Sequence, residues 1–281
     1  MKTYSTIPEI KAFLNTQKTQ NLTVGFVPTM GALHQGHISL IERAKKENDL
    51  CVCSIFVNPI QFNNPDDFTR YPVRTEKDIT MLKEAGCDAL FNPGKAEMYP
   101  APVSIKYDFG ELEKVMEGAF RPGHFNGVAI VVNRLFEIIE PDNAYFGEKD
   151  YQQLQIIRSL VKMEKIPVNI VPCGIIRDVD GLALSSRNAL LSAHERAVAP
   201  KIAAVLNECS SLARHMSVPE VKSYVQSKIT AIPEFKLDYF EIAEAATLQP
   251  VNSWNESDHI RAFIAVYLDK VRLIDNVRIF L

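Results

Sequence analysis

The sequence predicts an α/β fold built on a doubly wound parallel sheet, followed by a second, smaller α+β domain. Strand-like and helix-like segments alternate through residues 1–176, and such alternation indicates βαβ units with parallel strands. The strand-like runs are continuously apolar, which is typical of parallel strands covered on both faces. A polar, turn-prone segment at residues 177–181 then marks a change of character. We therefore expect one domain over residues 1–176 and another over 177–281.

The elements of the first domain follow from hydrophobic periodicity. Residues 24–28 form a short apolar run, whereas residues 38–48 carry apolar side chains at helical spacing on a charged background. The same criteria predict further strands over residues 51–57, 87–91, 143–146 and 168–176, and further helices over 75–85, 128–139 and 151–163.

The second domain is predicted to combine helices with a later group of strands. Two helical stretches cover residues 193–214 and 219–232, and strand-like runs cover 237–242, 260–268 and 277–280. The chain contains neither an internal repeat nor a low-complexity segment.

Composition excludes several classes of function. Apolar residues make up 47% and charged residues 23% of the chain, as in ordinary soluble globular proteins. The formal net charge of −3 gives no general attraction for nucleic acid or an anionic membrane, so we expect neither partner. The N-terminus lacks the apolar core of a signal peptide, and the longest apolar stretch, residues 50–57, is too short to span a bilayer. We therefore expect a cytoplasmic protein.

The cysteines indicate burial rather than chemistry. There are five, an odd count, and no C-x-x-C pair. Cys51 and Cys53 lie two apart on an expected strand and so share one face. We expect the cysteines to be buried as small apolar side chains rather than joined in disulfides or bound to a metal.

Unusual polar sequence follows several expected strands. In an open α/β sheet, ligands bind beyond the carboxyl ends of the strands. Three such ends carry Pro28-Thr29-Met30-Gly31, Asn58-Pro59-Ile60-Gln61 and Gly147-Glu148-Lys149-Asp150, and a fourth polar cluster, Leu184-Ser185-Ser186-Arg187, lies at the domain junction. These segments are the candidates for a functional site.

The first candidate is the H-x-G-H sequence formed by His34, Gln35, Gly36 and His37, preceded by Pro28-Thr29-Met30-Gly31-Ala32-Leu33. A strand ends there and a helix begins, and a helix N-terminus offers free N–H groups and a positive dipole end to phosphate. Imidazole adds hydrogen-bond donors. The plainer interpretation is a glycine turn followed by a histidine helix cap. The buried strand before the motif and the amphipathic helix after it favour phosphate binding.

The second candidate runs from Gly147 to Gln153. Gly147 allows a ribose to approach the backbone, Asp150 can accept from ribose hydroxyls, and Lys149 supplies a mobile cation for phosphates. Gln153 shares a helical face with Asp150 and can bind a small substrate. Taken alone, the segment is better explained by a polar helix start with a solvated charge run, and the nucleotide-binding interpretation is favoured only together with the H-x-G-H turn.

The third candidate is Ser185-Ser186-Arg187, in which two hydroxyls and a guanidinium could clamp an anion. The alternative is an ordinary serine-rich helix cap.

The fourth candidate is Gln61, which could hold a hydroxy acid through paired hydrogen bonds, although the proline-containing segment also reads as a plain turn. Arg121-Pro122-Gly123-His124 is a glycine-bounded loop with a cation. A surface loop and a substrate-covering loop explain it equally well.

Taken in order, these segments resemble the pantothenate synthetase family, the pantoate–β-alanine ligases of the H-x-G-H nucleotidyltransferase superfamily. The resemblance covers residues 24–191 and rests on P-T-M-G-A-L-H-x-G-H, S-I-F-V-N-P-x-Q-F, R-Y-P, F-R-P-G-H-F, F-G-E-K-D-Y-Q-Q and D-G-L-A-L-S-S-R-N. The last segment stands where related synthetases carry K-M-S-K-S, with Ala183, Leu184 and Ser186 at altered positions. Residues after 191 carry no usable motif.

The resemblance implies a Rossmann-like domain with a smaller C-terminal domain covering the active site, a homodimer, and two half-reactions. The carboxylate of pantoate would attack the α-phosphorus of MgATP, and the amine of β-alanine would then displace AMP to give pantothenate. The magnesium would arrive with the nucleotide, because the sequence has no dedicated metal cage.

The same resemblance implies roles for individual residues. His37, His34 and Lys149 are implied as catalytic, with His37 the usual proton donor. Gln61, also near β-alanine, and Gln153 would hold pantoate, with Asn58, Arg121 and His124 nearby. The implied ATP contacts are Met30, Gly31, Ala32, Leu33, His34, Gln35, Gly36, His37, Gly147, Glu148, Lys149, Asp150, Ile176, Leu184, Ser185, Ser186 and Arg187.

Two alternatives remain open at this level. A plain nucleotidyltransferase would use the same H-x-G-H turn to join AMP to a phosphate acceptor, without an amine-accepting step. A nucleotide-sensing module would bind ATP without turnover, although sensing alone does not require so many phosphate donors.

Overall fold

The computed structural model describes residues 1–63 and 65–279 and divides into two compact units. The first unit comprises Met1–Phe109, Arg121–Glu148 and Gln153–Gly174. The second comprises Gly110–Phe120, Lys149–Gln152 and Ile175–Leu281. Two short segments from the first part of the chain therefore belong with its C-terminal part.

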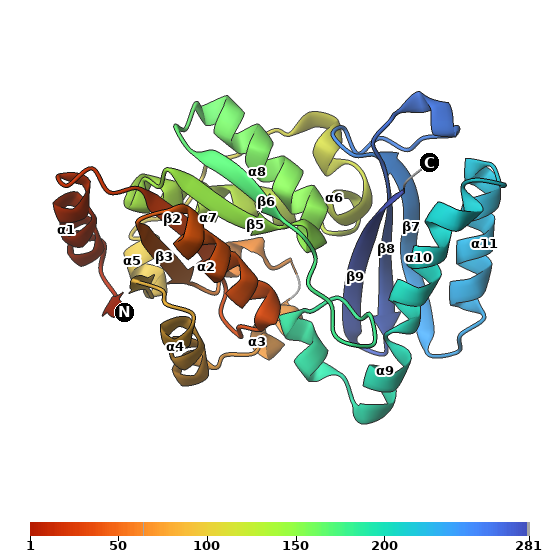
Figure 1. The fold of residues 1–281 in the computed structure, drawn as a ribbon, viewed down its shortest axis with the longest axis horizontal. Helices are drawn as coiled ribbons and strands as arrows, with labels where there is room; N and C mark the ends of the chain where they lie inside the picture. The colour runs from red at the N-terminus through yellow and green to blue at the C-terminus, as the bar shows by residue number, and fades with distance from the viewer. Residues whose placement is uncertain (64, 280–281) are drawn as a thin grey trace. The chain divides into compact units, whose positions relative to one another are not determined.

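The first unit is built on a six-stranded sheet with the order β1-β4-β3-β2-β5-β6, in which every paired strand is parallel (Figure 1). Its strands are β1 (Lys2–Tyr4), β2 (Val24–Thr29), β3 (Leu50–Ile55), β4 (Ala89–Phe91), β5 (Asn143–Gly147) and β6 (Asn169–Cys173). The helices along this part of the chain are α1 (Ile7–Lys18), α2 (Gln35–Glu47), η1 (Pro59–Gln61), α3 (Pro65–Arg70), α4 (Thr75–Glu84), α5 (Lys95–Met98), α7 (His124–Ile139), η3 (Glu148–Asp150) and α8 (Tyr151–Glu164).

The strand order reverses between β2 and β5. The chain proceeds from β2 outward through β3 to β4, and then returns to place β5 on the other side of β2. Ligands of doubly wound sheets bind at such a switch point, beyond the carboxyl ends of the strands. Those ends are Thr29 and Gly147, and both are followed by candidate motifs of the sequence.

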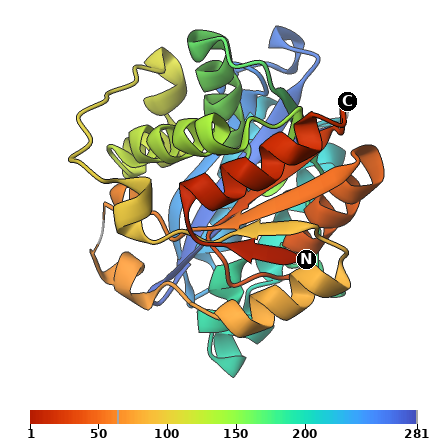
Figure 2. The same cartoon turned by 90° about the vertical axis from the view of Figure 1, so that its left-hand side faces the viewer.

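Helices cover both faces of this sheet (Figure 2). Side chains alternate between faces along a strand, so Phe26 of β2 meets Phe136 of α7 at 6.4 Å between ring centroids. Its neighbour Val27 belongs instead to the buried cluster that contains Ile41 of α2. Because both faces are covered, consecutive residues of β2 must be apolar, which explains the continuous apolar runs in the sequence.

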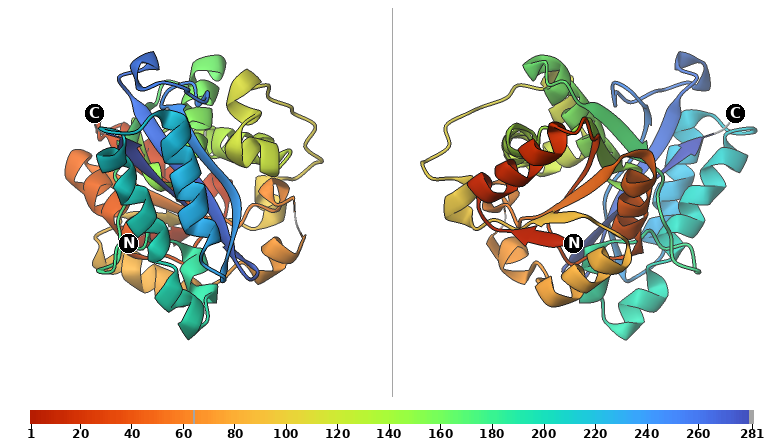
Figure 3. Two further views of the ribbon diagram at one scale, coloured as in Figure 1. Left: turned by 90° about the vertical axis from the view of Figure 1, so that its right-hand side faces the viewer. Right: turned by 60° about the vertical axis from the view of Figure 1, so that its left-hand side comes forward.

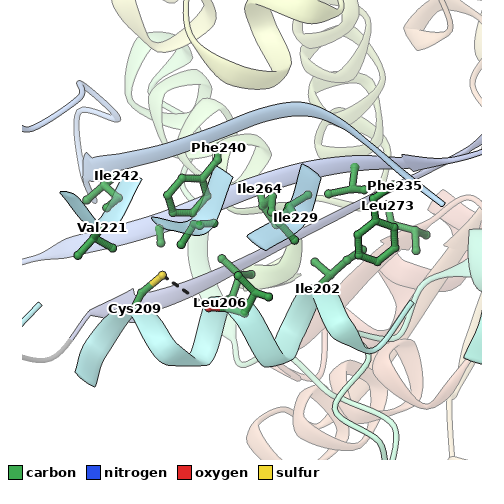
Figure 4. Packing of buried hydrophobic residues seen from close by; sticks show 14 of the residues in the cluster. Ile202, Leu206, Cys209, Val221, Ile229, Phe235, Phe240, Ile242, Ile264 and Leu273 are labelled. Carbon is green, nitrogen blue, oxygen red and sulfur yellow. Dashed lines mark hydrogen bonds between the residues drawn. The ribbon is translucent and has the colours of Figure 1, made fainter. Parts of the chain in front are cut away.

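The second unit contains an antiparallel sheet with the order β7-β8-β9. Helices α10 and α11 lie over one face of this sheet (Figure 3). Their apolar side chains pack against those of the strands (Figure 4). The elements are η2 (Gly110–Glu113), α6 (Met116–Phe120), η4 (Ser186–Leu190), α9 (Ala193–Val198), α10 (Lys201–Leu212), α11 (Val218–Thr230), β7 (Phe235–Glu244), η5 (Trp254–Glu256), β8 (Ile260–Leu268) and β9 (Val271–Ile279).

The predicted fold class is confirmed: a Rossmann-like doubly wound parallel sheet and a smaller α+β part are both present. Several element boundaries were wrong. The helix expected over 193–214 is interrupted after Val198, because Pro200 lacks the N–H needed to continue it. The strand expected over 168–176 ends at Cys173.

The last strand was also predicted wrongly, because β9 begins at Val271 rather than at residue 277. Asp275 and Asn276 look like turn residues in the sequence but are buried in the strand. Phe280, the predicted end of this strand, lies outside the described residues. Neither β1 nor α1 was predicted from periodicity, although Thr6 and Glu9 form a capping box at the start of α1.

The expected burial of the cysteines is confirmed, because all five are buried and none is joined in a disulfide. Burial raises the pKa of the Cys209 thiol to about 12 and also raises the pKa of Cys53. In the part of the chain that the structure describes, no helix has the length and apolar character needed to cross a membrane.

Candidate active site

The turn after β2 has a strained backbone that a buried carboxylate holds in place. Gly31 has φ 80° and Ala32 has φ 49°, a left-handed conformation that costs a non-glycine residue free energy. The carboxylate of Asp78 accepts hydrogen bonds from the backbone N–H groups of Ala32 and Leu33, both at 2.8 Å. The turn therefore keeps a fixed shape before α2 begins.

Asp78 was not identified from the sequence. Asp78 belongs to α4 and is 1% exposed. It lies outside all of the candidate motifs identified in the sequence. A signal was nevertheless present, because Asp78 lies four residues before the buried Leu82 and so shares the apolar face of its helix. A carboxylate on that face needs partners, which the turn supplies.

The two histidines of the H-x-G-H motif form a reciprocal cap at the start of α2. Nδ1 of His34 accepts from the N–H of Gly36 at 3.1 Å, and Nδ1 of His37 accepts from the N–H of His34 at 3.3 Å. A ring nitrogen that accepts carries no proton, so each neutral imidazole donates from Nε2. The first turn of α2 contains no acidic residue. The helix-capping and phosphate-binding interpretations of this motif are therefore compatible.

Gln61 is held in one orientation by its neighbours. Its Oε1 accepts from Nδ2 of Asn58 at 3.1 Å, and its Nε2 points to the sulfur of Met30 at 3.0 Å. Asn58 in turn accepts from the hydroxyl of Tyr99 at 2.9 Å. Burial raises the pKa of Tyr99, so its phenol stays protonated and donates. The Gln61 amide thus presents its NH₂ group toward the turn that precedes the histidines.

His124 contacts the backbone of the same glutamine. Its Nδ1 lies 2.9 Å from the carbonyl oxygen of Gln61, and its Nε2 lies 3.1 Å from Nη1 of Arg121. Because a carbonyl only accepts and a guanidinium only donates, Nδ1 carries the proton and Nε2 accepts. The structure thus gives the R-P-G-H loop a supporting contact to Gln61. A direct contact of Arg121 or His124 with substrate stays a prediction.

Gly127 of α7 allows the helix to lie directly against the segment that carries Gln61. A Cβ atom placed on Gly127 would lie 2.6 Å from Cα of Gln61 and 2.7 Å from the carbonyl oxygen of Ile60. Both neighbours are backbone atoms and cannot move aside as a flexible side chain could. The carbonyl of Gly127 also accepts from Nδ2 of Asn58 at 3.0 Å.

Gly127→Ala is therefore expected to lower stability and to weaken binding at Gln61. Alanine in a helix ordinarily stabilises a protein relative to glycine by about 0.5–1 kcal/mol. Overpacking against fixed atoms costs about 1–3 kcal/mol, so the clash outweighs that gain and the net free energy of unfolding falls. Thermal unfolding would measure the loss. Gly174→Ala is the control, because a Cβ there meets nothing within 4 Å. Equal melting temperatures for the two variants would contradict the expectation.

In the second unit, Lys149 and Asp150 form a close pair. Nζ of Lys149 lies 3.8 Å from Oδ1 of Asp150, and the two side chains are 17% and 50% exposed. A lysine so largely buried does not fit a solvated charge run, which was the plainer interpretation of this segment.

The two adjacent glutamines that follow have different surroundings. The amide of Gln152 accepts from the N–H of Glu117 at 2.9 Å and donates to the carbonyls of Leu112 and Val115 at 2.8 and 2.9 Å. Gln153, in the first unit, is partly buried and its side chain has no hydrogen bond to any residue in ranges 1–63 and 65–279. Gln152 therefore has a structural role, and Gln153 is the glutamine with an amide to offer a ligand.

The serine–arginine cluster follows a closed hairpin. Arg177 and Ala183 form an antiparallel bridge, and the N–H of Leu184 donates to the carbonyl of Ile176 at 3.0 Å. The hydroxyl of Ser185 accepts from the N–H of Arg187 at 3.3 Å and caps η4. Since this hydroxyl accepts from the backbone, its own proton remains for donation. Helix capping and anion binding are again compatible.

The predicted site residues fall into two groups. In the first unit the structure brings Met30 and Gln61 into contact, and Asn58 and His124 support Gln61. Arg121 contacts His124, and the two histidines cap the start of α2. Among the described residues, it contains no group of three or more His, Cys, Asp or Glu side chains that could hold a metal ion. The remaining predicted residues of the first unit are Gly31, Ala32, Leu33, Gln35, Gly36, Gly147, Glu148 and Gln153. Those of the second unit are Lys149, Asp150, Ile176, Leu184, Ser185, Ser186 and Arg187.

Comparison with known proteins identifies relatives along the whole chain. The family model described as pantoate-beta-alanine ligase matches residues 2–278. A pantothenate synthetase of Porphyromonas gingivalis is 50% identical over 279 residues, covering 99% of each chain. One from Cytophaga hutchinsonii is 47% identical and covers 100% of each chain.

Solved structures agree with this similarity. Pantothenate synthetase from Thermus thermophilus has a TM-score of 0.94 at 44% identity, with 100% of each chain covered. A pantoate-beta-alanine ligase from Francisella tularensis, described as complexed with beta-gamma ATP and beta-alanine, has a TM-score of 0.84 at 39% identity. The comparison covers 99% of this chain and 97% of that one.

Proposed function

Because the chain belongs to the pantoate-beta-alanine ligase family, we propose that it makes pantothenate through a pantoyl-adenylate, with the residues described above in defined roles. It is an ATP-dependent ligase that joins (R)-pantoate to β-alanine by an amide bond. The observation that most directly supports the adenylate route is the start of α2, where both imidazoles are fixed as Nε2 donors beside the positive end of a helix.

Activation of the carboxylate is the first step. An amine cannot displace oxygen from a carboxylate, so that oxygen must first become part of a good leaving group. A pantoate oxygen attacks the α-phosphorus, the α–β phosphoanhydride bond breaks, and pyrophosphate leaves. His34 and His37 donate from Nε2 to the phosphate oxygens, where negative charge develops as the phosphorus becomes five-coordinate. Donors that fit this geometry better than the ground state lower the barrier.

Further residues are proposed to take part in this step. Lys149 pairs with the phosphates that leave as pyrophosphate, and Ser185, Ser186 and Arg187 complete the anion clamp. Asp150 accepts from the ribose, beside the backbone of Gly147. The remaining ATP contacts are Met30–Leu33, Gln35, Gly36, Glu148, Ile176 and Leu184.

Gln61 and Gln153 hold pantoate. The Gln61 amide is fixed by Asn58, and Gln153 has its amide available, so the pair can bind the hydroxyl and carboxylate groups of a small acid.

In the second step the β-alanine nitrogen attacks the acyl carbon, the C–O bond to AMP breaks, and AMP leaves. Gln61 also lies near the incoming amine in this proposal, and closing of the junction loop shields the adenylate from water.

Magnesium is proposed to arrive with ATP. Mg²⁺ usually keeps several waters and binds through substrate phosphates with few protein carboxylates, so phosphate oxygens and water would supply most of its ligands. Bound there, Mg²⁺ would neutralise phosphate charge, while the side chains of this chain orient the nucleotide.

The route is tested by following one oxygen atom. Pantoate labelled with ¹⁸O in its carboxylate is expected to yield AMP that carries one labelled oxygen, together with unlabelled pyrophosphate. Mass spectrometry of the products decides the outcome. ADP with labelled inorganic phosphate would indicate an acyl-phosphate instead and would overturn the proposal.

The same experiment separates the remaining alternatives. A plain nucleotidyltransferase would form no AMP that depends on both pantoate and β-alanine, and a sensing module would leave ATP intact. Product formation that requires both acids supports the ligase against each of them.

Assembly and location extend the proposal. On the family resemblance, the protein is a cytoplasmic homodimer, with residues 1–176 binding ATP and pantoate and residues 177–281 covering the site. Small-angle X-ray scattering with and without ATP and pantoate measures both mass and compaction. A monomeric mass, or a radius of gyration that does not change with ligands, would contradict the corresponding part.

A further inference from the structure

We propose that Asp275 and Asn276, neighbouring residues of β9, are positioning residues that align the Lys149 segment and the Ser185–Arg187 loop for ATP. The inference rests on the proposed function, because both segments are proposed ATP contacts. It assigns a role to a part of the chain in which the sequence offered no usable motif. All the contacts that carry it lie within the second unit.

Asn276 connects β9 to the backbone of Lys149. Its Nδ2 donates to the carbonyl of Lys149 at 3.1 Å, and its Oδ1 accepts from Nη1 of Arg261. A guanidinium only donates and a carbonyl only accepts, so the amide can take only this orientation. The guanidinium of Arg261 also lies 4.1 Å from the ring centre of Tyr151. Residues 149–151 are therefore held from both β8 and β9.

Asp275 connects the same strand to the hairpin before the serine–arginine cluster. Its carboxylate binds Arg177 in a two-point ion pair, with N···O distances of 2.7 and 2.9 Å, and its side chain is 4% exposed. Arg177 also donates to the carbonyl of Gly181 at 3.0 Å. Leu182 of this hairpin is buried in the core of the second unit.

The hairpin in turn holds the loop that carries Ser185, Ser186 and Arg187, the proposed anion clamp. Nδ2 of Asn188 donates to the carbonyl of Ala183 at 3.0 Å, and its N–H donates to the carbonyl of Ser185. The loop that carries Ser185, Ser186 and Arg187 is thus attached at both ends to a hairpin that Asp275 anchors.

The position of the two residues on one strand explains their joint effect. Successive side chains of a strand point to opposite faces, and Asp275 shares its face with the core residue Leu273, labelled in Figure 4. Asn276 occupies the other face. The strand also joins the two directly, because the N–H of Asn276 donates to Oδ1 of Asp275 at 2.7 Å. One rigid strand therefore sets the spacing of two proposed phosphate-binding segments.

The geometry can be tested by Asn276→Asp. Aspartate keeps the shape and the acceptor for Arg261, but it places an oxygen against the Lys149 carbonyl and so removes that single bond. We expect kcat/KM for ATP to fall by about ten- to a hundredfold, as small displacements of catalytic groups do, with the KM for pantoate unchanged. Aminolysis of pantoyl-adenylate supplied in place of ATP is expected to keep its normal rate.

Two further variants separate positioning from stability. Asp238→Asn weakens a similarly buried pair in the same sheet, where Asp238 accepts from Nε of Arg272 at 2.9 Å. It is expected to lower the melting temperature without a defect that is specific to ATP. Arg177→Lys keeps the charge but loses the two-point ion pair with Asp275. It is expected to lower kcat/KM for ATP with an unchanged KM for pantoate, as Asn276→Asp does. Its effect should not add fully to that of Asn276→Asp, because the two share one network.

The outcomes are distinguishable. Wild-type enzyme that forms no pantoate-dependent AMP would overturn the proposed function and this inference with it. With an active wild type, an ATP-specific defect in Asn276→Asp and Arg177→Lys supports the inference. If both behave as Asp238→Asn does, or lose ATP and pantoate affinity equally, positioning by β9 is wrong. Should Asn276→Asp fail to fold, Arg177→Lys decides by the same comparison.

Discussion

His37→Ala is expected to slow adenylate formation by about 10²–10³-fold, the usual effect of removing one donor to a developing oxyanion. The imidazole is fixed with Nδ1 toward the backbone N–H of His34, so its Nε2–H is the group lost. Single-turnover kinetics with ATP and pantoate, before β-alanine is added, measure this step directly.

His37→Gln separates chemistry from helix capping. Glutamine at this third helical position can still accept from the N–H of His34, as in an ordinary capping box, so stability should return. The rate should remain well below that of the wild type, because the imidazole is still missing. Near-normal adenylation by His37→Ala would refute a catalytic role, and a slow rate that tracks melting temperature would indicate a purely structural one.

Lys149→Met is expected to slow the first half-reaction by about 10²–10³-fold, since it removes a charged donor from the phosphates. Methionine keeps much of the aliphatic stem and removes the ammonium group. Reaction of supplied pantoyl-adenylate with β-alanine should be nearly normal, because pyrophosphate has already left. Comparing the two half-reactions in a rapid-quench experiment measures the difference.

The matched control is Lys114→Met in the same unit. Lys114 pairs with Glu111 at 2.8 Å, but the two side chains are 64% and 67% exposed, and such surface pairs contribute about 0–1 kcal/mol. This variant should retain both half-reactions. An equal slowing of both steps in Lys149→Met would show that Lys149 does not act on the triphosphate.

Much of the first unit could be predicted because its signals are local in sequence. The apolar runs at β2 and β3 and the spacing in α2 follow from burial on both faces of a sheet and on one face of a helix. The H-x-G-H turn could be placed at a strand end by the same means. Short elements such as β1 carry too few residues for periodicity to appear.

Other features depend on contacts between residues far apart in sequence. Asp78 reaches Ala32 and Leu33 across 46 and 45 positions, and Gly127 is required only because Gln61 lies against it. In neither case could the contacting residues be predicted from the local sequence. Glycine in the middle of α7 looks like a mildly unfavourable helix residue until the neighbouring backbone is known.

The adjacent glutamines, Gln152 and Gln153, likewise combine a feature that the sequence predicts with one that only the structure shows. Helical spacing and family resemblance selected Gln153 over Gln152, and the structure supplies the physical difference: Gln152 is occupied by Leu112, Val115 and Glu117. The prediction that Gln153 binds pantoate awaits experiment.

The sequence by itself determined the α/β class, the order of the main elements, the burial of the cysteines and the chemistry of the motifs, because these depend on residue type and short-range periodicity. The tertiary structure alone decided the surroundings of Asp275 and Asn276, which resemble a turn in sequence. Both residues lie in a strand and are, as whole residues, 5% and 2% exposed, and burial of their polar side chains without partners would be unfavourable. Arg177 and the Lys149 carbonyl, 98 and 127 positions away, satisfy them. Only the folded chain brings such partners together.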